Sequence, residues 1–184
     1  MKRLGFGQVE PNHLSAQRTS QIYAQLPAAD DIKVLENGQF VKYDYAHGEC
    51  NFTGAGEWMM VFNEIKLYDD FWRESYKDFA MQKKNYTPGS DDITHDGLGP
   101  FKGQMVPRVI KINVGDHWTT NTLGKGNTDG KTVVECGDFS VGDLVKVDAT
   151  GFIVPGEDAD FQLQVVKVYT LADGQPAVKV MRIK

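Results

Sequence analysis

The amino-acid sequence predicts a mostly β protein, organised as a β-barrel or β-sandwich, with one short helix and an extended N-terminal arm. Short runs rich in β-branched and aromatic residues recur between glycine-containing turns from residue 32 to the end of the 184-residue chain. Two of these turns, Asn37-Gly38 and Asp173-Gly174, each lie between two such runs and are strong hairpin signals. Short strands at this spacing are typical of sandwiches and barrels.

The first 31 residues differ in composition from the rest of the chain. They are rich in Gln, Ser, Ala, Asn and Pro, with scattered apolar side chains. One interpretation is a short helix over residues 15–25, because Ser15 can cap it and Ala and Gln favour helix. The alternatives are an arm that becomes ordered only on a partner, or an ordinary frayed terminus. For an arm, we expect deletion of residues 1–26 to weaken partner binding and to leave the C-terminal core folded.

Strand signals begin at residue 32. Residues 32–35 and 39–45 flank the Asn-Gly turn, so they are expected to pair as a hairpin. Residues 58–62 form a continuous apolar run, which fits a strand buried on both faces or a buried helix. The glycines before this run and its aromatic content favour the strand.

Residues 69–84 are the strongest helix candidate. Their apolar side chains recur at three- and four-residue spacing, with acidic residues at the start and Lys83-Lys84 at the end, which suits the helix dipole. An irregular insertion is the alternative. Residues 85–103 are loop-like because they contain several glycines and prolines.

The C-terminal part returns to strand patterns. Alternating apolar and polar residues over 105–114 are followed by a β-prone run and by an exposed loop at 124–131. The further strands expected are 144–148, 152–154, 161–171 and 177–183. The predicted organisation is an N-terminal arm (1–31), a β-rich unit with a helical insertion (32–123) and a C-terminal β-rich unit (124–184). The last two are either two small β subdomains or one continuous domain.

Two segments of the chain are similar to each other. Residues 40–44 and 144–148 each follow a turn glycine, and each is succeeded by a second glycine and then by a long apolar strand. This pattern predicts a repeated unit of turn, half-buried strand, acidic turn and return strand. Two units could form two barrels or two halves of one, and chance similarity between β-hairpins is the competing explanation.

Composition argues against several classes of partner. The net charge is −5 and no block of basic residues occurs, so there is little electrostatic attraction to nucleic acid. No apolar run is long enough for a membrane-spanning helix, and the N-terminus lacks the apolar stretch of a secretory signal. The two cysteines, Cys50 and Cys136, are expected to be free thiols in a reducing compartment.

Candidate chemical motifs are weak. His47 and Cys50 are spaced like half of a zinc site, but no second half follows, and the acidic residues at 91, 92 and 96 lack the spacing of a calcium loop. No nucleophile elbow, P-loop or dinucleotide fingerprint is present. We therefore expect no catalytic residues, no metal and no cofactor. A small enzyme on a barrel scaffold is an alternative that a pocket with converging polar groups would favour.

Four segments resemble bacteriophage head auxiliary proteins, the capsid decoration or cement proteins: residues 35–44, 114–121, 141–148 and 172–180. The resemblance spans most of residues 32–184. It implies a β-rich, non-enzymatic protein on the capsid surface of the virion, assembled in the host cytoplasm. Its partner would be the major capsid protein, contacted in many copies near three-fold positions, and it could also associate with itself, for example as a trimer.

Such a protein could bind by adding a strand to a neighbour's sheet or by draping an arm over a seam. The alternative is another virion component, such as a tail or fibre protein that binds host-surface glycans. The aromatic and apolar residues expected at contacts are Leu4, Phe6 and Tyr23 in the arm and Tyr86, Phe101 and Trp118 in the loops.

Overall fold

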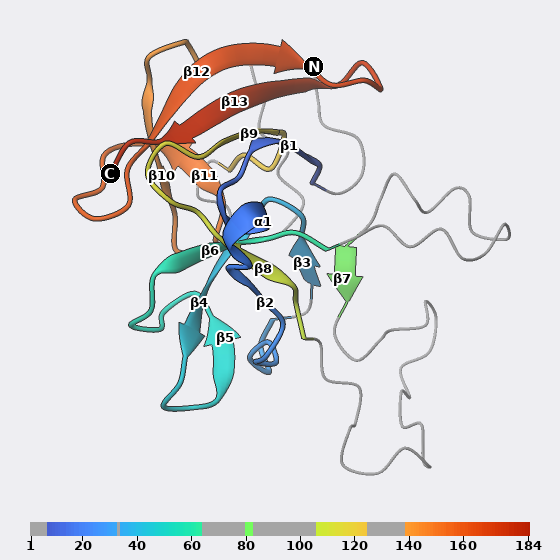
Figure 1. Ribbon diagram of the computed structural model, residues 1–184, viewed down its shortest axis with the longest axis vertical. Helices are drawn as coiled ribbons and strands as arrows, with labels where there is room; N and C mark the ends of the chain where they lie inside the picture. The colour runs from blue at the N-terminus through green and yellow to red at the C-terminus, as the bar shows by residue number, and fades with distance from the viewer. Residues whose placement is uncertain (1–6, 33, 64–79, 83–105, 125–138) are drawn as a thin grey trace, which may run out of the picture.

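The computed structural model describes residues 7–32, 34–63, 80–82, 106–124 and 139–184 (Figure 1). The described chain is mostly β, with two large antiparallel sheets, a two-stranded sheet and one short helix, α1 (Ala16–Thr19). The predicted fold class is therefore confirmed. Within the described residues neither sheet closes into a barrel, so the architecture is that of a sandwich.

The two large sheets draw their strands from distant parts of the sequence. The six-stranded sheet has the order β1 (Val9–His13), β9 (His117–Thr120), β13 (Pro176–Arg182), β12 (Leu163–Thr170), β10 (Leu144–Val147) and β11 (Ile153–Pro155). The five-stranded sheet has the order β2 (Ile22–Tyr23), β8 (Val109–Lys111), β6 (Trp58–Val61), β4 (Phe40–Asp44) and β5 (Glu49–Asn51). The small sheet pairs β3 (Val34–Glu36) with β7 (Ala80–Gln82). The hairpin expected between residues 32–35 and 39–45 is therefore wrong, because β3 pairs with β7 whereas β4 pairs with β5 and β6.

The main core lies between the two large sheets. Phe40 and Met60 from the five-stranded sheet belong to the same buried cluster as Trp118, Leu163 and other residues of the six-stranded sheet. The opposite face of the five-stranded sheet is also covered, because Val41 and Met59 pack in a second cluster with Ala29, Ile32 and Leu35. This double burial explains the continuous apolar run at residues 58–62, and the prediction of a strand there is confirmed, since all four residues of β6 are buried.

One turn occurs three times at the start of a strand. Gly38, Gly115 and Gly142 have φ of +87°, +91° and +97°, which fits the third position of a type II turn. In each turn the residue after the glycine donates its N–H to the carbonyl three residues earlier, at 3.0–3.1 Å. Its side chain also accepts a hydrogen bond from the N–H of the first turn residue, at 2.7–3.0 Å. The three turns therefore share one local geometry, and each leads directly into a strand of a large sheet.

The internal similarity corresponds to a repeated structural unit. β4 lies between β5 and β6, just as β10 lies between β11 and β12. The turn glycines make equivalent bonds, because the N–H of Gly38 donates to the carbonyl of Val61 at 2.8 Å and that of Gly142 donates to Val165 at 2.7 Å. The chain thus contains two related three-stranded units, one in each large sheet, whose inner faces form the common core.

The described part of the N-terminal segment is an integral part of the fold. β1 forms one edge of the six-stranded sheet and β2 one edge of the five-stranded sheet. Leu14 is 3% exposed and Ala16 is fully buried in the main core. Residues 7–31 therefore do not depend on a partner for order. Deletion of residues 1–26 would remove both strands and these core side chains, so we now expect it to destabilise the remaining core as well as to affect partner binding.

The helix expected over residues 15–25 is shorter than predicted. It covers only Ala16–Thr19, because Ser20 adopts a left-handed conformation with φ of +58° and the chain continues as β2. The stronger helix candidate, residues 69–84, lies mostly outside the described residues. Its residues 80–82 form β7, which pairs with β3, so a helix does not continue through that stretch. The loop expected at 85–103 also lies outside.

The boundary expected at residue 124 does not separate two sheets. β9 precedes it, whereas β13, β12 and β10 follow it, and all four belong to the six-stranded sheet. Both large sheets also contribute to the same main core. Of the two organisations considered, the described residues match one continuous domain rather than two small β subdomains.

Candidate interaction surface

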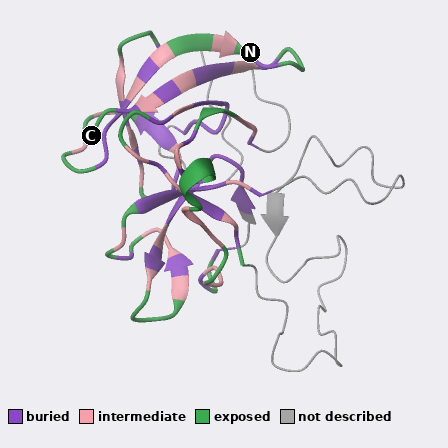
Figure 2. Ribbon diagram, in the orientation of Figure 1, coloured by how far each residue is buried: buried purple, intermediate pink, exposed green. Residues whose placement is uncertain are grey.

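The hairpin of β12 and β13 carries a strand whose second half is largely exposed. The first residues of β12 are buried or half-buried, but its second half is largely solvent-exposed (Figure 2). We call Lys167, Tyr169 and Lys179 the ribbon face. Lys167 lies directly opposite Lys179, and Tyr169 follows Lys167 by two positions, so the three side chains share one face of the hairpin.

A bulge in β12 puts Lys167 and Tyr169 on the outward side of the hairpin, where Lys179 of β13 also lies. Val165 points into the main core and pairs with Val180, whereas the next pair along the hairpin is Lys167 with Lys179. One extra residue, Val166, is therefore inserted in β12. In a regular strand with no bulge, Lys167 would lie two positions after Val165 and face the core with it. The bulge shifts the alternation by one residue and so moves the later side chains of β12 to the other face.

The ribbon face concentrates positive charge around an aromatic ring. The Nζ atoms of Lys167 and Lys179 lie 5.3 and 5.9 Å from the centre of the Tyr169 ring. Within the described part of the chain, neither lysine forms an ion pair with a carboxylate. Like charges directly opposite each other on neighbouring strands are unfavourable. The tyrosine offsets this repulsion, since a cation over an exposed ring gains roughly 0.5–1 kcal/mol.

Polar and aromatic groups continue from the ribbon face across the same sheet. Lys179 pairs with Thr119 of β9, whose hydroxyl donates to Asn12 Oδ1 at 2.9 Å. Further along β9, the ring of His117 stacks on that of His13, with centroids 5.6 Å apart. The outward side of the six-stranded sheet is therefore polar, whereas its inward side forms the main core.

The edges of the two large sheets offer little room for an added strand. β1 contains Pro11, which has no N–H, and a bulge between Pro11 and His13, and β2 has only two residues. The outer edges of β5 and β11 are bridged by Ala28 and Leu123. Prolines, bulges and covered edges are common protections against strand addition. The structure therefore favours contact through side chains over the strand addition considered from the sequence.

Two of the contact residues expected from the sequence lie in the described chain. Trp118 is fully buried and packs against Phe40 with ring centroids 6.0 Å apart, so the expectation that it contacts a partner is wrong. Its position on β9 turns it toward the core. Tyr23 is half-buried and makes an edge-to-face contact with Tyr43, with centroids 6.3 Å apart. Leu4, Phe6, Tyr86 and Phe101 lie outside the described residues.

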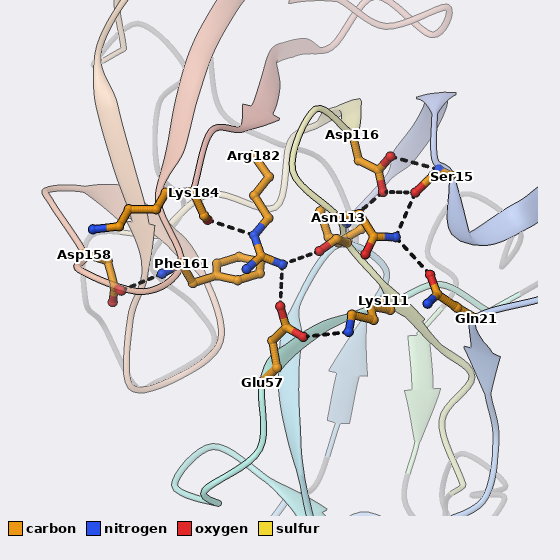
Figure 3. Close-up of polar contacts among 11 residues, drawn as sticks. Ser15, Gln21, Glu57, Lys111, Asn113, Asp116, Asp158, Phe161, Arg182 and Lys184 are labelled. Carbon is orange, nitrogen blue, oxygen red and sulfur yellow. Dashed lines mark hydrogen bonds and ion pairs between the residues drawn. The ribbon is translucent and has the colours of Figure 1, made fainter. Parts of the chain in front are cut away.

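A polar junction joins the two large sheets near the C-terminal end of β13 (Figure 3). The guanidinium of the buried Arg182 donates to Glu57 and to the carbonyl of Ile112, and its Nε donates to the carbonyl of Lys184 at 2.8 Å. The same group lies 4.3 Å from the centre of the Phe161 ring. Glu57 also forms a 3.2 Å ion pair with Lys111 of β8. These contacts satisfy a buried cation and hold the sheets together.

A second polar cluster at this junction fastens the N-terminal segment (Figure 3). The buried carboxylate of Asp116 accepts hydrogen bonds from the backbone N–H and the hydroxyl of Ser15, at 2.9 and 3.0 Å. The side-chain amide of Asn113 donates to the Ser15 hydroxyl at 2.8 Å and to Gln21 at 2.9 Å. Because every contact joins the β9 turn to the segment around α1, we interpret this cluster as structural.

The junction predicts a pH dependence of stability. Burial alone raises the pKa of Glu57, but hydrogen bonds from Arg182 and Lys111 outweigh it and hold the pKa below its usual 4.5. Since the folded pKa is lower than the unfolded one, this contribution is present above about pH 4.5 and lost as pH falls through the folded value. In urea denaturation, the free energy of unfolding should fall less between neutral and acid pH for Glu57→Gln than for the wild type. The difference should stay under about 1 kcal/mol because Glu57 is partly exposed. Identical pH profiles would contradict this.

The residues considered for metal binding or nucleophilic chemistry have other roles in the described chain. His47 Nδ1 lies 2.8 Å from Asp44 Oδ2 within its own hairpin, which raises the pKa of His47. Cys50 is buried, and burial raises the pKa of its thiol to about 12, so it is a protonated core side chain at neutral pH. No group of three or more His, Cys, Asp or Glu in the described ranges is placed to hold a metal ion. Cys136 and the acidic residues at 91–96 lie outside these ranges.

The comparisons with known proteins add no relative. No family model, no curated protein and no solved structure matches the chain. Among the described residues, no helix is long and apolar enough to cross a membrane. What points to a function is therefore the residues of this chain and the resemblance of its four segments to bacteriophage head auxiliary proteins.

Proposed function

We propose that this protein is a bacteriophage capsid decoration protein, which binds the outside of the major capsid protein lattice and stabilises the head. The observation that carries the proposal is the position of the segments that resemble this family. Three of the four contain the repeated type II turn, at Gly38, Gly115 and Gly142, and the fourth contains the turn at Gly174. The resemblance thus falls on residues that direct strands into the sheets, and not on arbitrary strand residues.

Exposed groups outside the core supply the surface that such a function needs. Val114 and Val141 occupy the same position in two of the repeated turns and are 64% and 65% exposed. With the ribbon face, they give a rigid framework several separate points of side-chain contact. A protein held by many modest contacts, repeated over the symmetric lattice of a head, gains strength from the number of contacts rather than from any single one.

The test is whether the protein occurs on particles in the copy number of a lattice component. Virions of the phage that encodes the chain would be purified and their protein composition quantified, and a particle reconstruction would locate the density. We expect copies in proportion to the major capsid protein, on the outer surface of the head. Absence from purified virions would overturn the proposal.

A tail or fibre component that binds host-surface glycans is the second candidate. It is favoured by Tyr45, which is 74% exposed at the end of the β4–β5 hairpin and makes an edge-to-face contact with Tyr43. Exposed tyrosine rings are suited to sugar faces. This candidate predicts a low copy number at the tail and binding to host glycans that Tyr45→Ala abolishes.

A further inference from the structure

We infer that the ribbon face binds a carboxylate-rich segment of the major capsid protein, with the acidic side chain held between the ammonium groups of Lys167 and Lys179. The inference rests on the proposed function and names the chemistry of the partner at one surface. It is carried by the cross-strand lysine pair, the tyrosine ring near both lysines and the bulge in β12 that puts Lys167 and Tyr169 on the same side as Lys179.

The lysine pair is unfavourable in the isolated protein. The two lysines are direct cross-strand neighbours, and no described carboxylate forms an ion pair with either of them. A sequence selected for stability alone would place opposite charges or a β-branched pair there. Departures from local rules of this kind are expected at functional surfaces, where a partner supplies the missing interaction.

Tyr169 prepares the two lysines for an anionic partner. Because both ammonium groups lie within 6 Å of the centre of its ring, their side chains are already partly ordered before binding. A carboxylate inserted between them would accept charge-assisted hydrogen bonds from both. The loss of side-chain freedom on binding would be smaller than for two unrestrained lysines.

The charge of the whole chain favours an acidic protein surface over a nucleic acid or an anionic membrane. The net charge is −5, so the ribbon face is a small positive area on an acidic molecule. Polyanions such as DNA are bound through many phosphate contacts, and the remaining negative charge would repel them. A compact acidic segment of a protein needs only the two lysines.

The experiment measures binding to empty capsids assembled from the major capsid protein alone. Wild-type protein would be compared with Lys167→Glu, Lys179→Glu and the double variant by co-sedimentation at low and moderate salt. The matched control is Lys42→Glu, since Lys42 also lies over an aromatic ring, 4.6 Å from the centre of Trp58, but on the other large sheet. We expect the double variant to bind about tenfold more weakly or worse, with the control close to wild type.

The single variants distinguish an effect on folding from an effect on binding. Lys167→Glu replaces a like-charge pair with an opposite-charge pair, so its melting temperature should equal or exceed that of the wild type while its binding falls. Failure of the wild type to bind capsids would count against the proposed function itself. Wild-type binding with unchanged affinity in the double variant would overturn only the present inference.

A second copy of this chain is also acidic, so binding between copies must be distinguished from binding to the major capsid protein. Glu157 and Asp160 follow β11 and are exposed, so they are the carboxylates that the ribbon face of a neighbouring copy would meet. Size-exclusion chromatography with light scattering would be run on the wild type and the double variant. Loss of self-association with unchanged capsid binding would overturn the inference, whereas an unchanged oligomeric state with reduced capsid binding supports it.

Discussion

Replacing Gly151 by alanine should destabilise the fold by about 3–5 kcal/mol. Gly151 has φ of +80°, a conformation that other residues adopt only with strain. A Cβ atom there would lie 2.2 Å from the backbone oxygen of Phe40, and backbone cannot move aside as a flexible side chain can. The carbonyl of Gly151 also accepts a hydrogen bond from the N–H of Phe40 at 2.7 Å, so the turn cannot withdraw without breaking this contact.

The matched control is the equivalent glycine of the other repeated unit. Gly48 has φ of +68°, but a Cβ there would meet nothing within 4 Å. Gly48→Ala should therefore show only the conformational strain, about 1 kcal/mol. Urea denaturation of both variants measures the difference. Equal destabilisation would contradict a close contact between the β10–β11 turn and the first residue of β4.

Replacing Arg182 by alanine should lower the free energy of unfolding by about 3 kcal/mol. The change leaves the carbonyl of Ile112 without its charged donor inside the protein and removes the cation from the face of Phe161. It also leaves Glu57 with Lys111 as its remaining cation. Unfolding would be followed by tryptophan fluorescence in urea, because Trp118 lies in the main core.

Lys111→Ala is the control for the Arg182 variant. Lys111 contacts the same carboxylate, but both side chains of that pair are more than one-third exposed. Exposed pairs contribute little, so its loss should change the free energy of unfolding by less than about 1 kcal/mol. If the two variants had similar effects, burial of the guanidinium would not be the source of the stability assigned to it.

Local features of the fold could be predicted from the sequence. The strand at residues 58–62 was recognisable because burial on both faces leaves an uninterrupted apolar run, and the repeated units because glycine with positive φ is required at the same place in each turn. Such signals depend on a few neighbouring residues. The helix expected at 15–25 was overestimated because the left-handed conformation of Ser20, an uncommon one for this residue type, leaves no mark in the sequence.

Features that depend on distant pairing could not be predicted. β1 has a polar composition, and only its pairing with β9, more than 100 residues later, identifies it as a strand. Trp118 was expected at the surface because nothing in its neighbours tells which side of β9 faces the core. The ribbon face was missed for a related reason. The bulge at Val166 reverses the alternation along β12, and a simple period of two would place Lys167 inside the protein.

The position of β1 has a consequence for how the chain reaches its native state. β1 pairs with β9, and β9 is flanked on its other side by β13, which begins more than 160 residues after β1 ends. β1 therefore lies against a complete sheet only after β13 has emerged from the ribosome. Contacts over such separations slow folding, because a long loop must close before the contacts form. During synthesis, β1 is thus made long before the strands that complete its sheet.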